Sequence, residues 1–346
     1  MNLETIKRER IYIGMLLFIL LFTTSFWGKG TLSKRSQWLA PGEKETGLIG
    51  TTEIEKILQE KINEGKPFQL YFFNFLLLFI LMAFLIGIFL NLFFLKRKRF
   101  SLINPLFPQV DWEISDLFRA GLFFYFFLCI LLFLEMFLPA SFFASFDSFL
   151  FLTLINTILG GVAAFLFIFG FLIKRCEKSK GHLAALLSIG KRKVEQVTLG
   201  IRSYLHLLPI LFFIGLLIGL LIKVTGYSPA ERTFAIFLLK ARSPFLLCFS
   251  ILSAAIFAPI FEEFLFRGFV FSSLRRRFGV KRGILFSSLL FAFVHRSLYG
   301  FLAIFALGVV LAYLYERTGS LIPSISLHCF NNGIASIFFL SLKSLL

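Results

Sequence analysis

Two adjacent carboxylates and a guanidinium stand inside an almost wholly apolar stretch, APIFEEFLFRGFV, at residues 258–270. On a helix, residues four positions apart share a face, so Glu263 and Arg267 are neighbours while Glu262 points elsewhere. A charge near the centre of a membrane costs about 2.5–3.5 kcal/mol on insertion scales, so such groups normally have partners or a function. The spacing predicts an ion pair between Glu263 and Arg267 and leaves Glu262 free for a reaction, unless all three belong to a structural network.

Two further apolar stretches contribute imidazole and amide groups. FAFVH places Phe291 and His295 four residues apart, and SLHCFNN does the same for His328 and Asn332. A buried carboxylate can act as a general base toward water, and neutral His and Asn side chains can stabilise a developing oxyanion where the dielectric constant is low. The three stretches together therefore contain the groups needed for hydrolysis by an activated water, although a single His in an apolar helix is more often a packing residue.

A metal site is the alternative for the same residues. Catalytic zinc sites commonly combine two His with one carboxylate, so Glu262, His295 and His328 could bind Zn²⁺. The chain has no HExxH motif, so the two imidazoles would come from different helices, which weakens this interpretation. The favoured water mechanism requires no cofactor.

The composition places these groups in a membrane protein. Of the 346 residues, 58% are hydrophobic and 16% are charged, and the mean hydropathy is +0.86, whereas soluble domains are about a quarter charged. Long apolar runs predict helices, because lipid cannot satisfy backbone polar groups. We predict an all-α, polytopic transmembrane helical bundle of about eight to nine spans. The candidate spans are 11–27, 69–95, 118–142, 148–173, 204–223, 244–272, 282–298, 299–315 and 320–342.

The polar groups of the spans concentrate in the last hundred residues or so of the chain, which suggests a division near residue 244. We predict an N-terminal transmembrane region at 1–243, to which the sequence assigns no role and which includes an outer loop at 28–68. The predicted catalytic core occupies residues 244–342.

The net charge of +17 is distributed in short basic clusters beside the apolar runs, such as KRKR at 96–99 and RRR at 275–277. This pattern follows the positive-inside rule and argues against nucleic-acid binding. It predicts a multi-pass protein of the cell membrane, inner or plasma, with a cytoplasmic N-terminus and membrane lipids as partners. The RRR cluster lies just beyond Glu262 and suits a cytoplasmic mouth that faces anionic lipid or an acidic substrate segment.

The three motifs, taken in order, resemble those of a known family. EEFLFR, FAFVH and HCFNN are similar to the EExxxR, FxxxH and HxxxN motifs of the CAAX-protease and bacteriocin-processing family, also called the Abi family. The resemblance covers about residues 244–340. It implies a helical intramembrane endopeptidase whose substrate is a polypeptide with a cleavage site close to the membrane.

The resemblance also implies a role for each motif position. Glu262 and His295 would activate the water, and His328 with Asn332 would form the oxyanion hole. The supporting residues would be Glu263, Arg267 and Phe291. Members of the family are often labelled metalloproteases, although this mechanism needs no metal.

Two other classes of function remain open. Intramembrane Glu, His and Arg residues also form proton relays, which would suit an ion-coupled transporter, but the sequence has no evident inverted repeat. A proteolytically inactive scaffold or a bacteriocin self-immunity factor would keep the same fold and recruit partners instead of cutting them.

Overall fold

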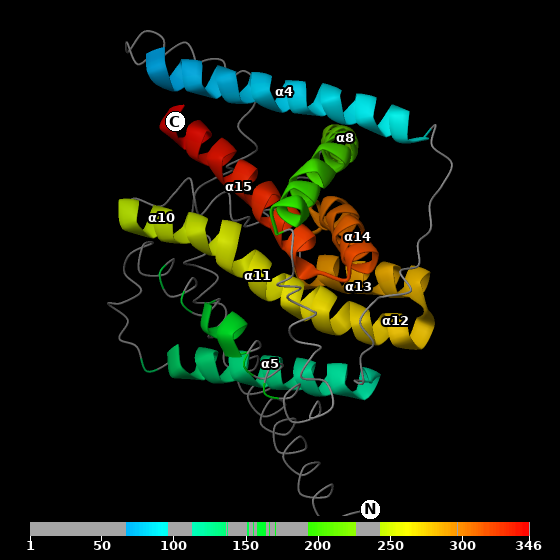
Figure 1. Cartoon of the computed structure of the whole chain (residues 1–346). Coiled ribbons are helices and arrows are strands. Elements are labelled where there is room, and N and C mark those ends of the chain that lie inside the picture. Colours follow the sequence, from blue (N-terminus) through cyan, green and yellow to red (C-terminus); the bar gives the residue numbers. More distant parts are fainter. Residues whose placement is uncertain are drawn as a thin grey trace, which may run out of the picture.

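The computed structural model describes residues 67–95, 113–135, 137, 193–225, 243–295 and 297–345, together with 151, 155, 158–163, 166 and 170. All regular elements in these parts of the chain are helices, which confirms the predicted all-α class (Figure 1). Six of the described helices are long and apolar enough to cross a membrane. The protein is therefore an integral membrane protein.

The predicted count of about eight to nine spans is not confirmed. The span predicted at 11–27 lies outside the described residues, as does most of the one at 148–173. The span predicted at 282–298 corresponds to helix α13 (Val280–Val294), which has 15 residues, fewer than the roughly 17–25 that a crossing helix needs. The six helices of sufficient length contain Phe68–Phe93, Ile114–Leu131, Val194–Thr225, Pro244–Phe278, Phe301–Thr318 and Leu321–Ser344.

The span that carries the two carboxylates is one helical path with two widened segments. It runs through α10 (Pro244–Leu252), η2 (Ser253–Phe257), α11 (Ala258–Glu263), η3 (Phe264–Phe271) and α12 (Ser272–Phe278), where η2 and η3 are π-helical. Pro259 explains the first of these, because proline has no N–H and its ring clashes with the carbonyl four residues back. The helix widens just before it, and the Ala258 N–H donates to the Ser253 carbonyl, five residues back.

Two glycines at positive φ reverse the chain between the helices that follow. Gly279 (φ 80°) joins α12 to α13, and Gly319 (φ 65°) joins α14 (Phe301–Thr318) to α15 (Leu321–Leu345). At Gly283 an added Cβ would lie 2.9 Å from the Cα of Arg275, so α12 and α13 approach each other closely. Turns that only glycine adopts readily therefore fold α13 back on α12 and α15 back on α14.

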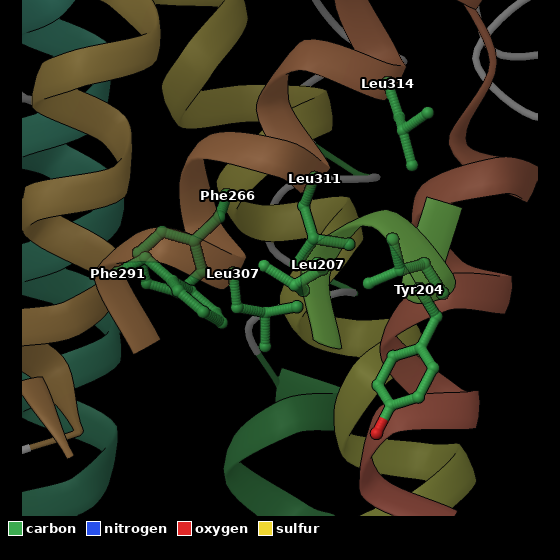
Figure 2. Packing of buried hydrophobic residues seen from close by; sticks show 8 residues of the cluster. Tyr204, Leu207, Phe266, Phe291, Leu307, Leu311 and Leu314 are labelled. Carbon is green, nitrogen blue, oxygen red and sulfur yellow. The ribbon is translucent and has the colours of Figure 1, made fainter. Parts of the chain in front are cut away.

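Helices from the N-terminal part also pack on this region. Helix α8 (Lys193–Thr225) contacts α14 and α15, α4 (Pro67–Leu95) contacts α8 and α15, and α5 (Ile114–Glu135) contacts α12. A buried apolar cluster joins α8 to η3, α13, α14 and α15 (Figure 2). Its members are Tyr204, Leu207, Phe266, Phe291, Leu307, Leu311, Leu314 and Leu327. The division of the chain at residue 243 remains a prediction, and α8 is packed into the core that carries the motifs.

Candidate active site

Three polar side chains from three helices converge next to the buried apolar cluster that joins α8 to η3, α13, α14 and α15. Glu262 lies on α11, His295 follows the last residue of α13, and His328 lies on α15. The Glu262 Oε2 atom is 3.8 Å from His295 Nε2 and 3.7 Å from His328 Nε2. The side chains of Glu262 and His295 are 29% and 30% exposed, whereas that of His328 is 3% exposed. The site is therefore open beside Glu262 and His295 and closed behind His328.

Hydrogen bonds at Nδ1 fix the orientation of both imidazole rings. His295 Nδ1 lies 2.6 Å from the Phe291 carbonyl oxygen, and His328 Nδ1 lies 2.9 Å from Glu263 Oε1. A backbone carbonyl and a carboxylate can only accept, so each Nδ1 must carry a proton and donate it. In a neutral ring this leaves Nε2 as an acceptor, and both Nε2 atoms face Glu262.

The centre of the site thus combines three hydrogen-bond acceptors when both rings are neutral. Glu262 Oε2 is buried and accepts no hydrogen bond from the described residues. Acceptors 3.7 and 3.8 Å apart cannot bond to each other directly, but a molecule that donates protons can bridge them. The arrangement suits a water molecule whose protons point at a carboxylate and an imidazole.

The predicted ion pair between Glu263 and Arg267 is present and fully buried. Glu263 Oε1 lies 3.0 Å from Arg267 Nη1, and the two side chains are 0% and 1% exposed. The contact does not meet the geometry of a hydrogen bond at Nη1, so the attraction is mainly one of charge at short range. Arg267 Nη2 donates to the Gly308 carbonyl at 3.3 Å. Glu263 holds Arg267 and His328 at once, a double role that helical spacing alone did not predict.

Phe291 is the apolar centre of the same network. Its ring is fully buried and lies edge-on to the rings of His295 and His328, at centroid distances of 4.6 and 5.7 Å. The Arg267 guanidinium lies 4.3 Å from the centroid of the Phe291 ring, a cation–π contact. One aromatic side chain therefore packs against both imidazoles and the buried cation, and its carbonyl orients His295.

Asn332 is engaged by the widened helix that precedes Glu262. Its Nδ2 donates to the Ala254 carbonyl at 2.9 Å, and its Oδ1 accepts from Asn331 Nδ2 at 3.0 Å. The residue five positions after Ala254 is Pro259, which has no N–H to give, so the π-helical pattern leaves this carbonyl without a backbone donor. The Asn332 side chain supplies that donor, and its second N–H remains for another acceptor.

The geometry of the zinc alternative is looser than a metal site needs. In tetrahedral coordination with bonds of about 2.0–2.1 Å, ligand atoms lie about 3.3–3.4 Å apart, and the distances here are 3.7 and 3.8 Å. In the part of the chain that the structure describes, no group of three or more His, Cys, Asp or Glu side chains is placed to hold a metal ion. The two Nδ1–H bonds are nevertheless of the kind that orient metal-bound His.

The basic cluster at 275–277 is not a uniform surface. Arg275 donates from Nε to Glu316 Oε2 and from Nη2 to Glu316 Oε1, the latter at 3.0 Å. Glu316 is fully buried, so this two-pronged pair ties α12 to α14. Arg275 is thus engaged within the helical bundle, whereas Arg276 and Arg277 are exposed. The interpretation of RRR as a cytoplasmic mouth remains a prediction.

Comparison with known families agrees with the resemblance noted in the sequence. Residues 244–334 match the family model described as type II CAAX prenyl endopeptidase Rce1-like. The matched region begins at α10 and ends within α15, so it contains all three motifs. No match was found among curated proteins or among solved structures.

Proposed function

We propose that this protein, with a CAAX-protease-like region at residues 244–334, is an intramembrane endopeptidase that hydrolyses a peptide bond near the membrane. The observation that supports this most directly is the position of Glu262 Oε2 between the Nε2 atoms of His295 and His328. A buried, unpartnered carboxylate oxygen facing two imidazoles is an arrangement that can bind and deprotonate water. The substrate is a polypeptide whose cleavage site lies at membrane depth.

In the proposed reaction, Glu262 is the general base and His295 orients the water. One water proton points to Glu262 Oε2 and the other to His295 Nε2. As the water oxygen bonds to the carbonyl carbon of the substrate, its first proton passes to Glu262. When the C–N bond breaks, that proton is transferred to the departing amine. The products are a carboxyl terminus and an amino terminus, and Glu262 is again ionised.

His328 and Asn332 are proposed to stabilise the oxyanion. Since His328 Nδ1 donates to Glu263, His328 can donate from Nε2 only when the ring carries both protons. Two carboxylate oxygens lie near this ring, Glu263 Oε1 at 2.9 Å from Nδ1 and Glu262 Oε2 at 3.7 Å from Nε2. A cationic donor to an oxyanion is stronger than a neutral one, and oxyanion donors typically contribute about 2.7–4 kcal/mol. Asn332 would add its second amide N–H.

The proposed location is the cell membrane, inner or plasma, with the N-terminus in the cytoplasm. The exposed basic residues that follow α11 along the same helical path support this orientation through the positive-inside rule. Glu262 then reaches water from the cytoplasmic half of the membrane.

The test is a comparison of cellular peptide termini between cells producing the wild-type protein and cells producing Glu262→Gln. We expect a new pair of termini in wild-type cells, and one accumulating uncut polypeptide with Glu262→Gln and with His295→Ala. Gly219→Ala is the matched control, because an added Cβ there meets nothing within 4 Å. All variants are first checked for wild-type elution on size-exclusion chromatography.

The proposal fails if a folded Glu262→Gln protein generates the same termini at the wild-type rate. A Glu262→Gln protein that keeps the biological function of the wild type without cutting would favour the scaffold alternative. Stoichiometric zinc that is retained by the wild type and lost from His328→Ala would replace the metal-free mechanism with the zinc one.

A further inference from the structure

Exposed basic side chains gather at the turn between α12 and α13. Arg276 and Arg277 lie in the last turn of α12, and Lys281 and Arg282 lie in the first turn of α13, all four exposed. Gly279 (φ 80°) reverses the chain between the two helices. We call these four side chains the cationic turn. Because they lie within seven consecutive positions, their charges act on the same small area.

The described residues around the cationic turn supply little negative charge. Residues 244–345 contain three acidic side chains, namely Glu262, Glu263 and Glu316. Glu263 and Glu316 are fully buried in ion pairs, and Glu262 faces the two imidazoles. Helix α5 packs on α12. It carries Asp116, which is paired with Arg119, and ends at Glu135, while Glu113, just before the helix, is exposed. Among the described residues, the exposed positive charge of Arg277, Lys281 and Arg282 therefore has little negative charge nearby to balance it.

Large apolar side chains border the cationic turn. Phe278, Leu285 and Phe286 are 39%, 44% and 38% exposed, and the two phenylalanine rings meet edge to face at a centroid distance of 5.7 Å. Aromatic and aliphatic surface directly beside basic groups is typical of the boundary between the hydrocarbon and the headgroups of a membrane. A ligand that fits both parts has a negative head and an apolar tail.

We propose that the cationic turn, with Phe278, Leu285 and Phe286, is a binding site for anionic phospholipid. The basic side chains contact the phosphate and other negative groups of the head, and the three apolar side chains contact the acyl chains. An acidic peptide would use the charges but leave the apolar border uncovered, so the lipid accounts for more of the surface.

This site is mechanically connected to the candidate active site. The helical path from α11 to α12 is continuous, so the depth of the cationic turn in the headgroup layer also sets the depth of Glu262. The close contact of Gly283 with the Arg275 backbone makes α12 and α13 move together. Anionic lipid at the turn would therefore hold the carboxylate-bearing helix at a fixed depth. Lipid binding itself does not depend on the proposed protease activity.

The experiment measures lipid retention by the full-length protein. The protein is equilibrated in mixed micelles with equal amounts of phosphatidylglycerol and phosphatidylcholine, separated by gel filtration, and its bound lipids are quantified by mass spectrometry. We expect wild type to retain an excess of phosphatidylglycerol that falls as salt is added, because salt screens exposed charges. Each basic residue near an anionic surface is typically worth roughly a fivefold change in affinity.

The informative variant is the triple change Arg277→Gln, Lys281→Gln and Arg282→Gln, which should abolish the excess. Lys223→Gln, in the last turn of α8, is the matched control and should keep it. Both variants are compared with wild type only after their elution profiles and thermal unfolding show that they are folded to the same extent. The proposal is overturned if the triple variant retains as much phosphatidylglycerol as wild type, or if Lys223→Gln loses as much. It is also overturned if an acidic peptide, but not phosphatidylglycerol, distinguishes wild type from the triple variant.

Discussion

Arg267→Ala tests the buried network from which the candidate active site is built. In the structure Glu263 is 0% exposed and its Oε1 is shared between Arg267 Nη1 at 3.0 Å and His328 Nδ1 at 2.9 Å. Truncating the arginine leaves this carboxylate buried without its permanent cation. Removing one partner of a buried ion pair typically costs about 3–5 kcal/mol, because the remaining charge is uncompensated.

Two smaller contacts are lost with the same side chain. The hydrogen bond from Arg267 Nη2 to the Gly308 carbonyl contributes about 1.5–3 kcal/mol, since its donor is charged. The cation–π contact with Phe291 contributes up to about 2 kcal/mol when desolvated. These terms overlap, so the expected loss in the free energy of unfolding is about 4–5 kcal/mol, with the orphaned Glu263 as its largest part.

The cause can be separated from simple loss of packing by a double-mutant cycle. Glu263→Gln removes the charge but leaves an acceptor for His328, and it orphans Arg267 in turn. If the two charges stabilise each other, the double variant Glu263→Gln/Arg267→Ala should be less destabilised than the sum of the single variants, by about 2–3 kcal/mol. Arg267→Lys keeps the positive charge but lacks the planar guanidinium group, so its free energy of unfolding should lie between those of wild type and Arg267→Ala.

The assay is denaturant-induced unfolding in a mild detergent, followed by circular dichroism. Arg277→Ala is the matched control, since that arginine is exposed on the same helical path, and it should change stability by less than about 0.5 kcal/mol. The reasoning would be refuted if Arg267→Ala were as stable as this control, or if the cycle were additive.

Three further predictions concern contacts that hold the helices around the site. Gly200→Ala should lower the thermal stability, because an added Cβ would lie 2.4 Å from a backbone carbonyl oxygen of α15, whereas Gly219→Ala, with nothing within 4 Å, should be neutral or slightly stabilising. Equal melting temperatures for these two variants would contradict the close packing of α8 on α15. Glu316→Gln should lower the free energy of unfolding by about 2–4 kcal/mol, because it leaves the largely buried Arg275 without its anion. The double variant Glu316→Gln/Arg275→Gln should recover part of this stability. If it recovers none, the two side chains do not stabilise each other as a pair. Phe291→Ala should lower the free energy of unfolding, measured with denaturant, by about 3–5 kcal/mol through the cavity it creates. Phe291→Leu should lower it clearly less. Similar losses for both variants would show that the volume of the ring does not determine the effect.

Local spacing was enough to predict part of the site. The pair of Glu263 with Arg267 lies four residues apart on one helix, so the geometry of the helix itself brings the two charges together. The separate orientation of Glu262 follows from the same geometry. The apolar composition likewise predicted helices that cross a membrane, because hydrocarbon leaves the backbone no alternative for long apolar runs.

Contacts between distant segments could not be predicted in this way. The bond from His328 to Glu263 joins residues 65 positions apart, and the pair of Arg275 with Glu316 joins residues 41 positions apart. Nothing in the sequence spacing of these four residues specifies which partner each one has. These contacts depend on the angle and depth at which the helices pack, which is a property of the whole bundle.

The amino-acid sequence by itself determined which residues can carry the chemistry and which of them share a helical face. The tertiary structure decided how those faces meet. It assigned Glu263 to His328 as well as to Arg267, gave Asn332 the carbonyl that Pro259 leaves without a donor, and aimed two imidazoles at Glu262. The physical reason is that helical periodicity is a local property of the chain, whereas the partners of a buried polar group are fixed only when neighbouring helices exclude water around it.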